Sequence, residues 1–312
     1  MSNLDTQPDV TKCVASGVGR PVAETYPART VPLGGIRGIN VERVLPHRGL
    51  PTVGAWCFYD HFGPHQDVMT VLPHPHTGLQ TVTWPFTGEI RHRDTLGSDV
   101  VLRPGQLNLM TSGRGIAHSE ISVSGPLHGL QLWVALPADH EIKPGFAQHV
   151  ALPTYAGAGI EGIVFMGALG DVESPATVHT PLVGAELTVT RSGVLPLRPD
   201  WEYALVVIEG AIDAAGVTLT PGPLLYLGTG RSDLSLTGDA KVILLGGEPF
   251  PDELVMWWNF VGRGHQDIAE ARADWEGADP ARFGVIPAHG TDRIPAPELP
   301  NLRLTPRKRH LT

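Results

Sequence analysis

The feature that most constrains this chain is the regular interruption of short apolar runs by glycine and proline. From about Arg37 onward, runs such as residues 79–86 and 128–137 alternate apolar and polar side chains and then end at turn residues. Alternation of apolar and polar side chains from one residue to the next is typical of half-buried β-strands. The 312 residues include 37 glycines and 29 prolines without a collagen period. Such frequent glycine and proline residues exclude a bundle of long helices and predict a fold of many short strands.

Short apolar runs interrupted by glycine and proline occur again between about Val150 and Glu248, and they predict a second β-domain. Residues 81–110 and 204–227 share an order of features, in which a strand ends at a glycine and a Pro-Gly pair opens a later strand. The paired positions are Gly88 with Gly210, and Pro104-Gly105 with Pro221-Gly222. The join falls in the polar, proline-bearing residues 136–145. We therefore expect two domains of similar design, residues 1–137 and 138–312.

Only Gln266–Trp275 reads strongly as helix, because it is rich in alanine and acidic residues, follows Gly264 and precedes Pro280. It comes after the second β-domain, and we expect it to pack against the outside of a sheet. The residues from Pro287 onward are rich in proline and are predicted to be irregular.

Charge and cysteine content limit the partners and the compartment. The net charge of −9 does not favour direct nucleic-acid binding, which needs a basic face. A short basic stretch at the end of the chain is read as a solvated tail: Arg303, Arg307, Lys308, Arg309 and His310. The two cysteines, Cys13 and Cys57, cannot build a disulfide framework. With no signal-peptide core and no apolar run of bilayer length, we expect a soluble cytoplasmic protein.

Two short motifs carry the chemistry. His74 and His76 stand two residues apart, and so do His118 and Glu120. On a strand, residues at this spacing project to one face, so two such strands can close a metal site of three nitrogens and one oxygen. An isolated His-x-His pair near a proline also arises by chance, but the second motif some forty residues later favours the metal interpretation. Imidazoles with a carboxylate and no thiolate suit Fe(II), Mn(II), Co(II), Ni(II), Cu(II) or Zn.

These motifs sit within longer strings that resemble the pirin family, whose members are bicupins of the cupin superfamily. The strings are residues 58–64, 73–78, 88–94, 110–120 and 130–137, and in the second half residues 247–250 and 257–261. The resemblance spans nearly the whole chain. A general cupin would carry a glutamate where this chain has Gln80, whereas Glu120 takes that place in pirins.

The resemblance implies an all-β fold of two tandem cupin barrels (double-stranded β-helix or jelly-roll) with a short C-terminal helical segment. It implies that His74, His76, His118 and Glu120 bind one metal ion, Fe(II) before the other divalent metals. The second domain would be metal-free and followed by the closing helix and the tail, because its corresponding strand, residues 203–209, contains no histidine.

Several other residues are open to both a structural and a functional interpretation. His61 and His65 are predicted to bond loop backbone in a turn, and His92, between two arginines, is predicted to be exposed. His128 and Gln131 could bond the ligating residues or only nearby backbone. Arg114 could steer an anionic substrate or lie free on the surface. The remaining candidates are core or pocket aromatics and lone surface histidines: Trp56, Phe58, Trp84, His149 and His179.

The resemblance leads to two hypotheses about function. In the first, the protein is a metal-dependent dioxygenase, an oxidoreductase acting on a flavonol such as quercetin (a quercetin 2,3-dioxygenase, or quercetinase). Glu120 would then be the general base that takes the substrate hydroxyl proton. In the alternative, it is a redox-sensitive regulator that binds a transcription factor or a metabolic enzyme. The sequence leaves enzyme and regulator open. A storage-protein-like or sugar-isomerase cupin is disfavoured because of Gln80, and we expect a monomer.

Overall fold

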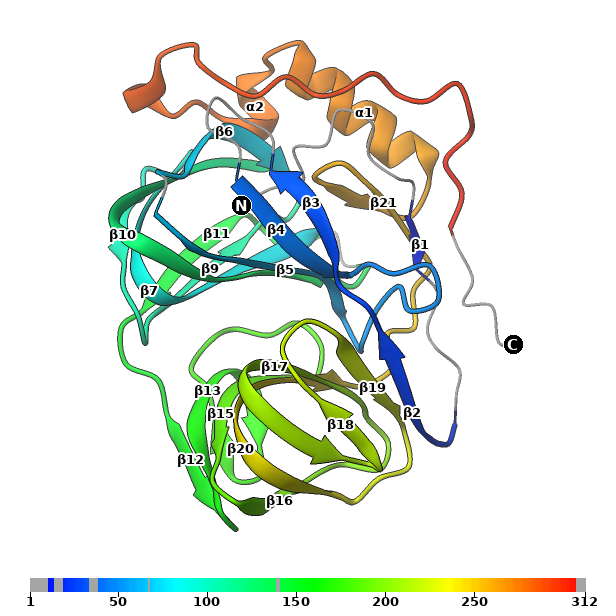
Figure 1. The fold of residues 1–312 in the computed structure, drawn as a ribbon. Helices are drawn as coiled ribbons and strands as arrows, with labels where there is room; N and C mark the ends of the chain where they lie inside the picture. The colour runs from blue at the N-terminus through cyan, green and yellow to red at the C-terminus, as the bar shows by residue number, and fades with distance from the viewer. Residues whose placement is uncertain (1–10, 14–18, 34–38, 67, 139–140, 307–312) are drawn as a thin grey trace.

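The computed structural model describes residues 11–13, 19–33, 39–66, 68–138 and 141–306. The basic tail residues 307–310 and the side chain of Cys13 lie outside this description. Within it, the chain forms two large antiparallel β-sheets, one small sheet and a short helical segment near the C-terminus (Figure 1). The prediction of an all-β protein with a late helix is confirmed.

The first large sheet positions the candidate site. Its central strands follow the order β11-β9-β7-β10-β5-β4-β3, while β6 pairs with β10 and β8 pairs with β7. The strands are β3 (Arg29–Leu33), β4 (Ile39–Leu45), β5 (Trp56–His65), β6 (Thr70–His76), β7 (Leu79–Asp94), β8 (Asp99–Leu102), β9 (Leu107–Thr111), β10 (Ile116–Ala135) and β11 (Gly145–His149). The long strands β7 and β10 pair with each other along most of their length and lie in the middle of this sheet.

The second large sheet has the order β12-β13-β15-β20-β17-β19-β2, with β14, β16 and β18 attached to β13, β20 and β17. The strands are β2 (Pro21–Tyr26), β12 (Thr154–Gly157), β13 (Ile160–Leu169), β14 (Val172–Glu173), β15 (Leu182–Val189), β16 (Ser192–Pro196), β17 (Glu202–Ala214), β18 (Val217–Leu219), β19 (Leu224–Gly228) and β20 (Asp233–Gly247). Residues 203–209, predicted to form a strand without histidine, lie in β17.

The two paired glycines do not end their strands, contrary to the sequence-based expectation. Gly88 lies inside β7 and Gly210 inside β17, and both have φ of +80°. A Cβ atom at Gly210 would lie 2.1 Å from the Asp239 carbonyl oxygen. Glycine therefore allows each strand to bend and continue. The Pro-Gly pairs do precede strands, β9 and β19, as predicted.

The strand pairing exchanges terminal segments between the two halves of the chain. N-terminal strand β2 pairs with β19 of the second sheet, and β11 pairs with β9 of the first. Both pairings cross a division at residue 137, so domains of exactly residues 1–137 and 138–312 stay a prediction. The third sheet likewise joins the two ends of the chain. Its strands are β1 (Thr11–Cys13), β21 (Leu254–Trp257) and β22 (Phe260–Gly262).

The predicted helix is present as α1 (His265–Glu276), one residue longer at each end than expected. It begins after Gly264, and the Asp267 carboxylate accepts hydrogen bonds from the backbone N–H groups of Arg263 and Gly264 at 2.7 and 3.1 Å. Its buried face packs on β21 and β22, which lie beside the first domain (Figure 1). The segments α2 (Pro280–Phe283) and the 3-10 turn η1 (Pro287–His289) follow. No helix in the described ranges combines the length and apolar character needed to span a bilayer.

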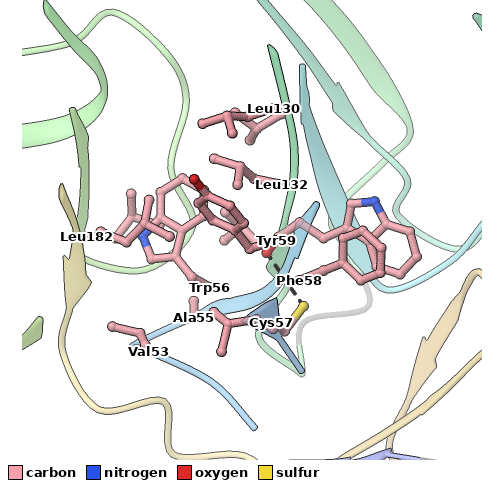
Figure 2. Packing of buried hydrophobic residues seen from close by; sticks show 14 of the residues in the cluster. Val53, Ala55, Trp56, Cys57, Phe58, Tyr59, Leu130, Leu132 and Leu182 are labelled. Carbon is pink, nitrogen blue, oxygen red and sulfur yellow. Dashed lines mark hydrogen bonds between the residues drawn. The ribbon is translucent and has the colours of Figure 1, made fainter. Parts of the chain in front are cut away.

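One hydrophobic core runs across both domains. Figure 2 shows part of it: Trp56 of β5 lies beside Leu182 of β15, with Val53, Ala55 and Leu132 around them. The Trp56 Nε1–H lies 3.0 Å from the Val183 carbonyl oxygen and 3.2 Å from that of Gly246, both in the second sheet. The Gly54 N–H also donates across the boundary, to Glu202 Oε1 at 2.6 Å. The two domains are therefore joined by a continuous apolar interface with buried hydrogen bonds.

Cys57 belongs to this core and is a free thiol. Its Sγ–H donates weakly to the Trp133 carbonyl oxygen at 3.6 Å (Figure 2). Burial raises the pKa of the thiol to about 12, so Cys57 is a packing residue and not a nucleophile.

Candidate metal centre

Three strands bring the predicted ligands together. Strand β6 pairs with β10 so that His74 lies opposite His118 and His76 opposite Ile116, with an irregularity between His118 and Glu120. Strand β7 pairs with the other edge of β10. The side chains of all four predicted ligands are fully buried. The ring centroids of the three histidines lie 4.4 to 5.1 Å apart. The sequence spacing therefore placed the three imidazoles correctly in one cluster.

The imidazoles turn ring nitrogens toward one another. His74 Nδ1–H donates to the Leu72 carbonyl oxygen at 2.8 Å, which leaves the buried Nε2 without a partner among the described residues. His76 Nε2 and His118 Nε2 are 3.1 Å apart. Burial lowers the pKa of His74 to about 3 and lowers those of His76 and His118 well below the usual value. Three converging neutral imidazoles, with the buried His74 Nε2 among their unpartnered nitrogens, fit a metal cation.

The carboxylate joins the cluster through His118. The side chains of His74, His76 and His118 place ligand atoms within 4.8 Å of one another, and so do those of His92, His118 and Glu120. The Thr83 hydroxyl donates to Glu120 Oε1 at 2.9 Å and lies 3.2 Å from Gln131 Oε1. Gln131, predicted as a possible partner of the ligating residues, thus reaches Glu120 through Thr83. In the described parts of the chain, both groups lie in the first domain.

A row of buried or half-buried polar side chains crosses the inner face of this domain at the level of Glu120. Directly paired residues on neighbouring strands share a face, and the register runs in this order across β4, β5, β10, β7, β9 and β11: Arg43, Asp60, Gln131, Thr83, Asn108 and Gln148. The Arg43 guanidinium makes two hydrogen bonds to the Asp60 carboxylate, at 2.6 and 2.7 Å. Sequence reasoning missed this row, because single polar residues within apolar runs do not show which of them are cross-strand neighbours.

His92 is buried, not exposed as predicted. Its ring stacks on Phe146 at 4.3 Å with an interplanar angle of 13°. Its Nδ1 lies 3.4 Å from His118 Nδ1, and its Nε2 lies 3.2 Å from Asp94 Oδ2. The flanking arginines point outward, where Arg91 and Arg93 both pair with Asp99. The signal was available in the alternation of residues 90–94, which places His92 on the same face as Ile90.

Neither group of potential ligands includes His61, His65, His128 or His149. His61 and His65 are in β5 and not in a turn, and His65 bonds the Asn40 backbone carbonyl at 2.8 Å as expected of a structural residue. His128 contacts His61, with their Nε2 atoms 2.7 Å apart, and does not contact the predicted ligands. His149 is half-buried in β11. These positions give no support to a ligand role.

The aromatic candidates divide between the two faces of the sheet. Phe58 stacks on Trp133 with centroids 4.0 Å apart, and Trp133 also contacts His76 at 5.3 Å. Trp84 instead faces the second domain, where its Nε1–H donates to Glu186 Oε2 at 2.6 Å. Arg114 is exposed and lines a surface pocket of about 530 Å³ together with Arg263 and Arg282. Of the three aromatic residues considered in the sequence, Trp56, Phe58 and Trp84, only Phe58 therefore lies on the side of the sheet that faces the imidazoles.

The neutral imidazoles predict a pH-dependent stability of the metal-free protein. An imidazole with a depressed folded-state pKa binds fewer protons when folded than when unfolded, so stability is full above the unfolded pKa of about 6.5 and falls below it. With a folded pKa of about 3, His74 alone should cost about 2 kcal/mol at pH 5. Urea unfolding between pH 5 and about 7.5 measures this slope. The variant His74→Asn should have a shallower slope, and an unchanged slope would contradict the assignment.

Comparison with known proteins agrees with this geometry. Residues 38–134 match the pirin family and residues 183–283 match the pirin C-terminal cupin domain. A Pseudomonas aeruginosa protein that bears the name "putative quercetin 2,3-dioxygenase" is 44% identical over 284 residues, which are 88% of this chain and 89% of the relative. A pirin-like protein of Caulobacter vibrioides is 34% identical over 291 residues, covering 88% and 98% of the two chains.

A solved structure extends the agreement to three dimensions. The crystal structure of quercetin 2,3-dioxygenase from Acinetobacter baumannii superposes with a TM-score of 0.83 at 38% identity, covering 90% of this chain and 96% of that one. The expectation of two tandem cupin domains is confirmed. With both family matches and relatives over most of its length, this chain belongs to the pirin family.

Proposed function

We propose that this protein is an iron-class dioxygenase acting on a flavonol such as quercetin, with its metal held by His74, His76, His118 and Glu120. The observation that carries the proposal is the convergence of three neutral, fully buried imidazoles beside a buried carboxylate. Three nitrogens, one oxygen and no thiolate are a donor set for Fe(II), and Mn(II), Co(II), Ni(II), Cu(II) and Zn suit the same donors. The names of the relatives from Pseudomonas and Acinetobacter support the flavonol.

Glu120 is the proposed base of the reaction. When bound, the metal supplies the Lewis-acid and redox chemistry that a flavonol and dioxygen require. The protein's own part is to take the proton of the flavonol hydroxyl on a Glu120 carboxylate oxygen. A base must also be correctly oriented. Thr83 orients the Glu120 carboxylate by donating its hydroxyl proton to Oε1 at 2.9 Å. The carboxylate is thereby fixed toward the imidazoles before substrate arrives.

The wall around the imidazoles suits an oxygen-bearing aromatic molecule. Phe58 and Trp133 provide stacked aromatic surface next to His76. The buried Trp133 Nε1, whose ring contacts His76, has no hydrogen-bond partner among the described residues. Buried donors without partners cost free energy, and ring oxygens of a flavonol are acceptors that could satisfy them.

Replacing Glu120 with glutamine tests the base role. Glutamine keeps the size and one oxygen of the side chain but cannot accept a proton at the relevant pH. We expect turnover of quercetin to be abolished while metal content falls much less, because the three histidines remain. Metal analysis and the flavonol absorbance of the same sample measure the two effects. Equal loss of metal and of turnover would overturn the base role and leave Glu120 as a ligand alone.

We further propose that the protein works in the cytoplasm as a monomer. The unpaired buried Cys57 suits a reducing compartment. The size-exclusion mass of the purified protein, compared with the 33.4 kDa of one chain, tests the monomer.

We propose a redox-sensitive regulator, which binds a transcription factor or a metabolic enzyme, as the second candidate function. The observation that favours it is the complete burial of all four predicted ligands. A regulator needs only a change in the charge of the metal, and that change does not require a substrate to reach the buried ligands. This candidate predicts stoichiometric iron without oxygen-dependent loss of quercetin. It also predicts that amide hydrogen exchange in strands β6 and β10 differs between the ferrous and the ferric protein. Identical exchange in the two states would exclude it.

A further inference from the structure

We infer that Asp94 and His92 form a hydrogen-bonded relay that fixes the tautomer of His118 and so directs its Nε2 lone pair toward the cluster. His92 and Asp94 are positioning residues in this assignment, since neither needs to touch the metal or the substrate. The inference rests on the proposed metal centre for its functional meaning. The relay itself is a property of the protein without metal, and it can be tested separately.

The relay begins at a carboxylate anchored by backbone. Asp94 is the last residue of β7, and its Oδ1 accepts hydrogen bonds from the N–H groups of Leu96 and Ser98 at 2.9 and 3.1 Å. Its Oδ2 is the atom that faces His92 Nε2 at 3.2 Å. The residues Asp94 and His92 are each 1% exposed. The turn after β7 therefore aims one carboxylate oxygen at one imidazole nitrogen inside the protein.

Only one arrangement of protons satisfies all three groups. The two backbone N–H groups on Oδ1 favour the ionised form of Asp94, and an ionised carboxylate can only accept hydrogen bonds. His92 Nε2 must then carry the proton, and its Nδ1 becomes an acceptor. His118 Nδ1, 3.4 Å away, donates to that acceptor. His118 Nε2 is left with a free lone pair, 3.1 Å from His76 Nε2.

The surroundings of His92 hold this arrangement in place. Phe146 lies parallel to the His92 ring at 4.3 Å, so the imidazole cannot rotate without breaking the stack. A carboxylate that bonds a histidine behind a metal ligand is a common device for orienting the ligand and increasing its basicity. Here a second imidazole carries the effect from Asp94 to His118.

The substitution Asp94→Asn should reverse the relay without changing the shape of the side chain. The Leu96 and Ser98 N–H groups require an oxygen, so the asparagine NH₂ group would face His92 Nε2. His92 would then protonate at Nδ1, His118 would protonate at Nε2, and the lone pair toward the cluster would be lost. Changing such partners typically costs metal affinity roughly 10- to 100-fold. We expect a loss of this size for Ni(II), used as an air-stable probe.

Nitrogen-15 NMR of the histidine rings in the metal-free protein provides a readout that a merely structural role would not move. In the wild type we expect the proton of His118 on Nδ1 and that of His92 on Nε2, and in Asp94→Asn the reverse. The matched control is His128→Asn, which removes a ring from the other histidine pair, where His61 and His128 are 2.7 Å apart. Its Ni(II) affinity should stay within about twofold of the wild type.

The possible failures are distinguishable. A wild-type His118 protonated at Nε2 overturns the relay, and this measurement needs no variant, so a poorly folded Asp94→Asn protein does not prevent the test. Unchanged Ni(II) affinity in a folded Asp94→Asn protein also overturns it. A wild type that binds neither Ni(II) nor Fe(II) overturns the proposed function instead, and the ring-nitrogen spectrum still decides the relay.

Discussion

Replacing His118 with alanine is expected to abolish stoichiometric metal binding and, with it, oxygen-dependent loss of quercetin. His118 is the one residue common to both groups of potential ligands, and its ring lies 4.4 Å from that of His74 and 5.0 Å from that of His76. Its removal takes away one nitrogen donor and also separates Glu120 from the other imidazoles. The loss of affinity should therefore exceed the roughly 10- to 100-fold expected for residues that act behind a ligand.

The measurement is metal content of the purified protein beside an anaerobic-to-aerobic assay that follows the flavonol absorbance. His149→Ala is the matched control, because His149 is half-buried in β11 of the same domain but belongs to neither group. The control should retain both metal and turnover. Stoichiometric metal in His118→Ala would remove His118 from the ligand set. Metal without turnover in the wild type would favour the regulator, and a wild type without metal would contradict both functions.

The pairs of candidate ligands that lie two residues apart on one strand could be predicted from the sequence. His74 with His76, and His118 with Glu120, share a face because strand side chains alternate. That rule needs no knowledge of which strands are neighbours. The same rule applied to residues 90–94 would have placed His92 inside the protein. The expectation of an exposed His92 failed because it took the charges of Arg91 and Arg93 as evidence about the residue between them.

Cross-strand relationships were not predictable from single segments. Thr83 and Gln131 belong to strands that are far apart in sequence, and their link to Glu120 depends on the register of β7 and β10. The pairing of β2 with β19 and the position of α1 beside the first domain are likewise tertiary choices. A short alternating segment shows that it forms a strand, but the apolar area available on each sheet decides where it pairs.

The largest expected loss of stability follows from removing Trp56, the residue that connects the two domains. The side chain is fully buried in the shared core, and its ring makes an edge contact with Phe165 of the second domain at 6.3 Å between centroids. Truncating a buried tryptophan to alanine typically costs about 3–5 kcal/mol. The carbonyl groups of Val183 and Gly246 also lose the indole N–H that lies near both. We expect Trp56→Ala to destabilise the protein by at least about 3 kcal/mol in urea unfolding at neutral pH.

The variant Trp56→Phe separates the two contributions. Phenylalanine retains most of the apolar contact but has no N–H, so its cost should approach the roughly 1–3 kcal/mol of leaving a buried acceptor unsatisfied. Trp201→Ala is the comparison within one domain, because Trp201 packs in the core confined to the second sheet and stacks under Arg198 at 4.7 Å. If the domains unfold as one unit, fluorescence and circular dichroism should give the same midpoint in every variant. A loss below about 1 kcal/mol for Trp56→Ala would mean that the interface contributes little and that each domain is stable by itself.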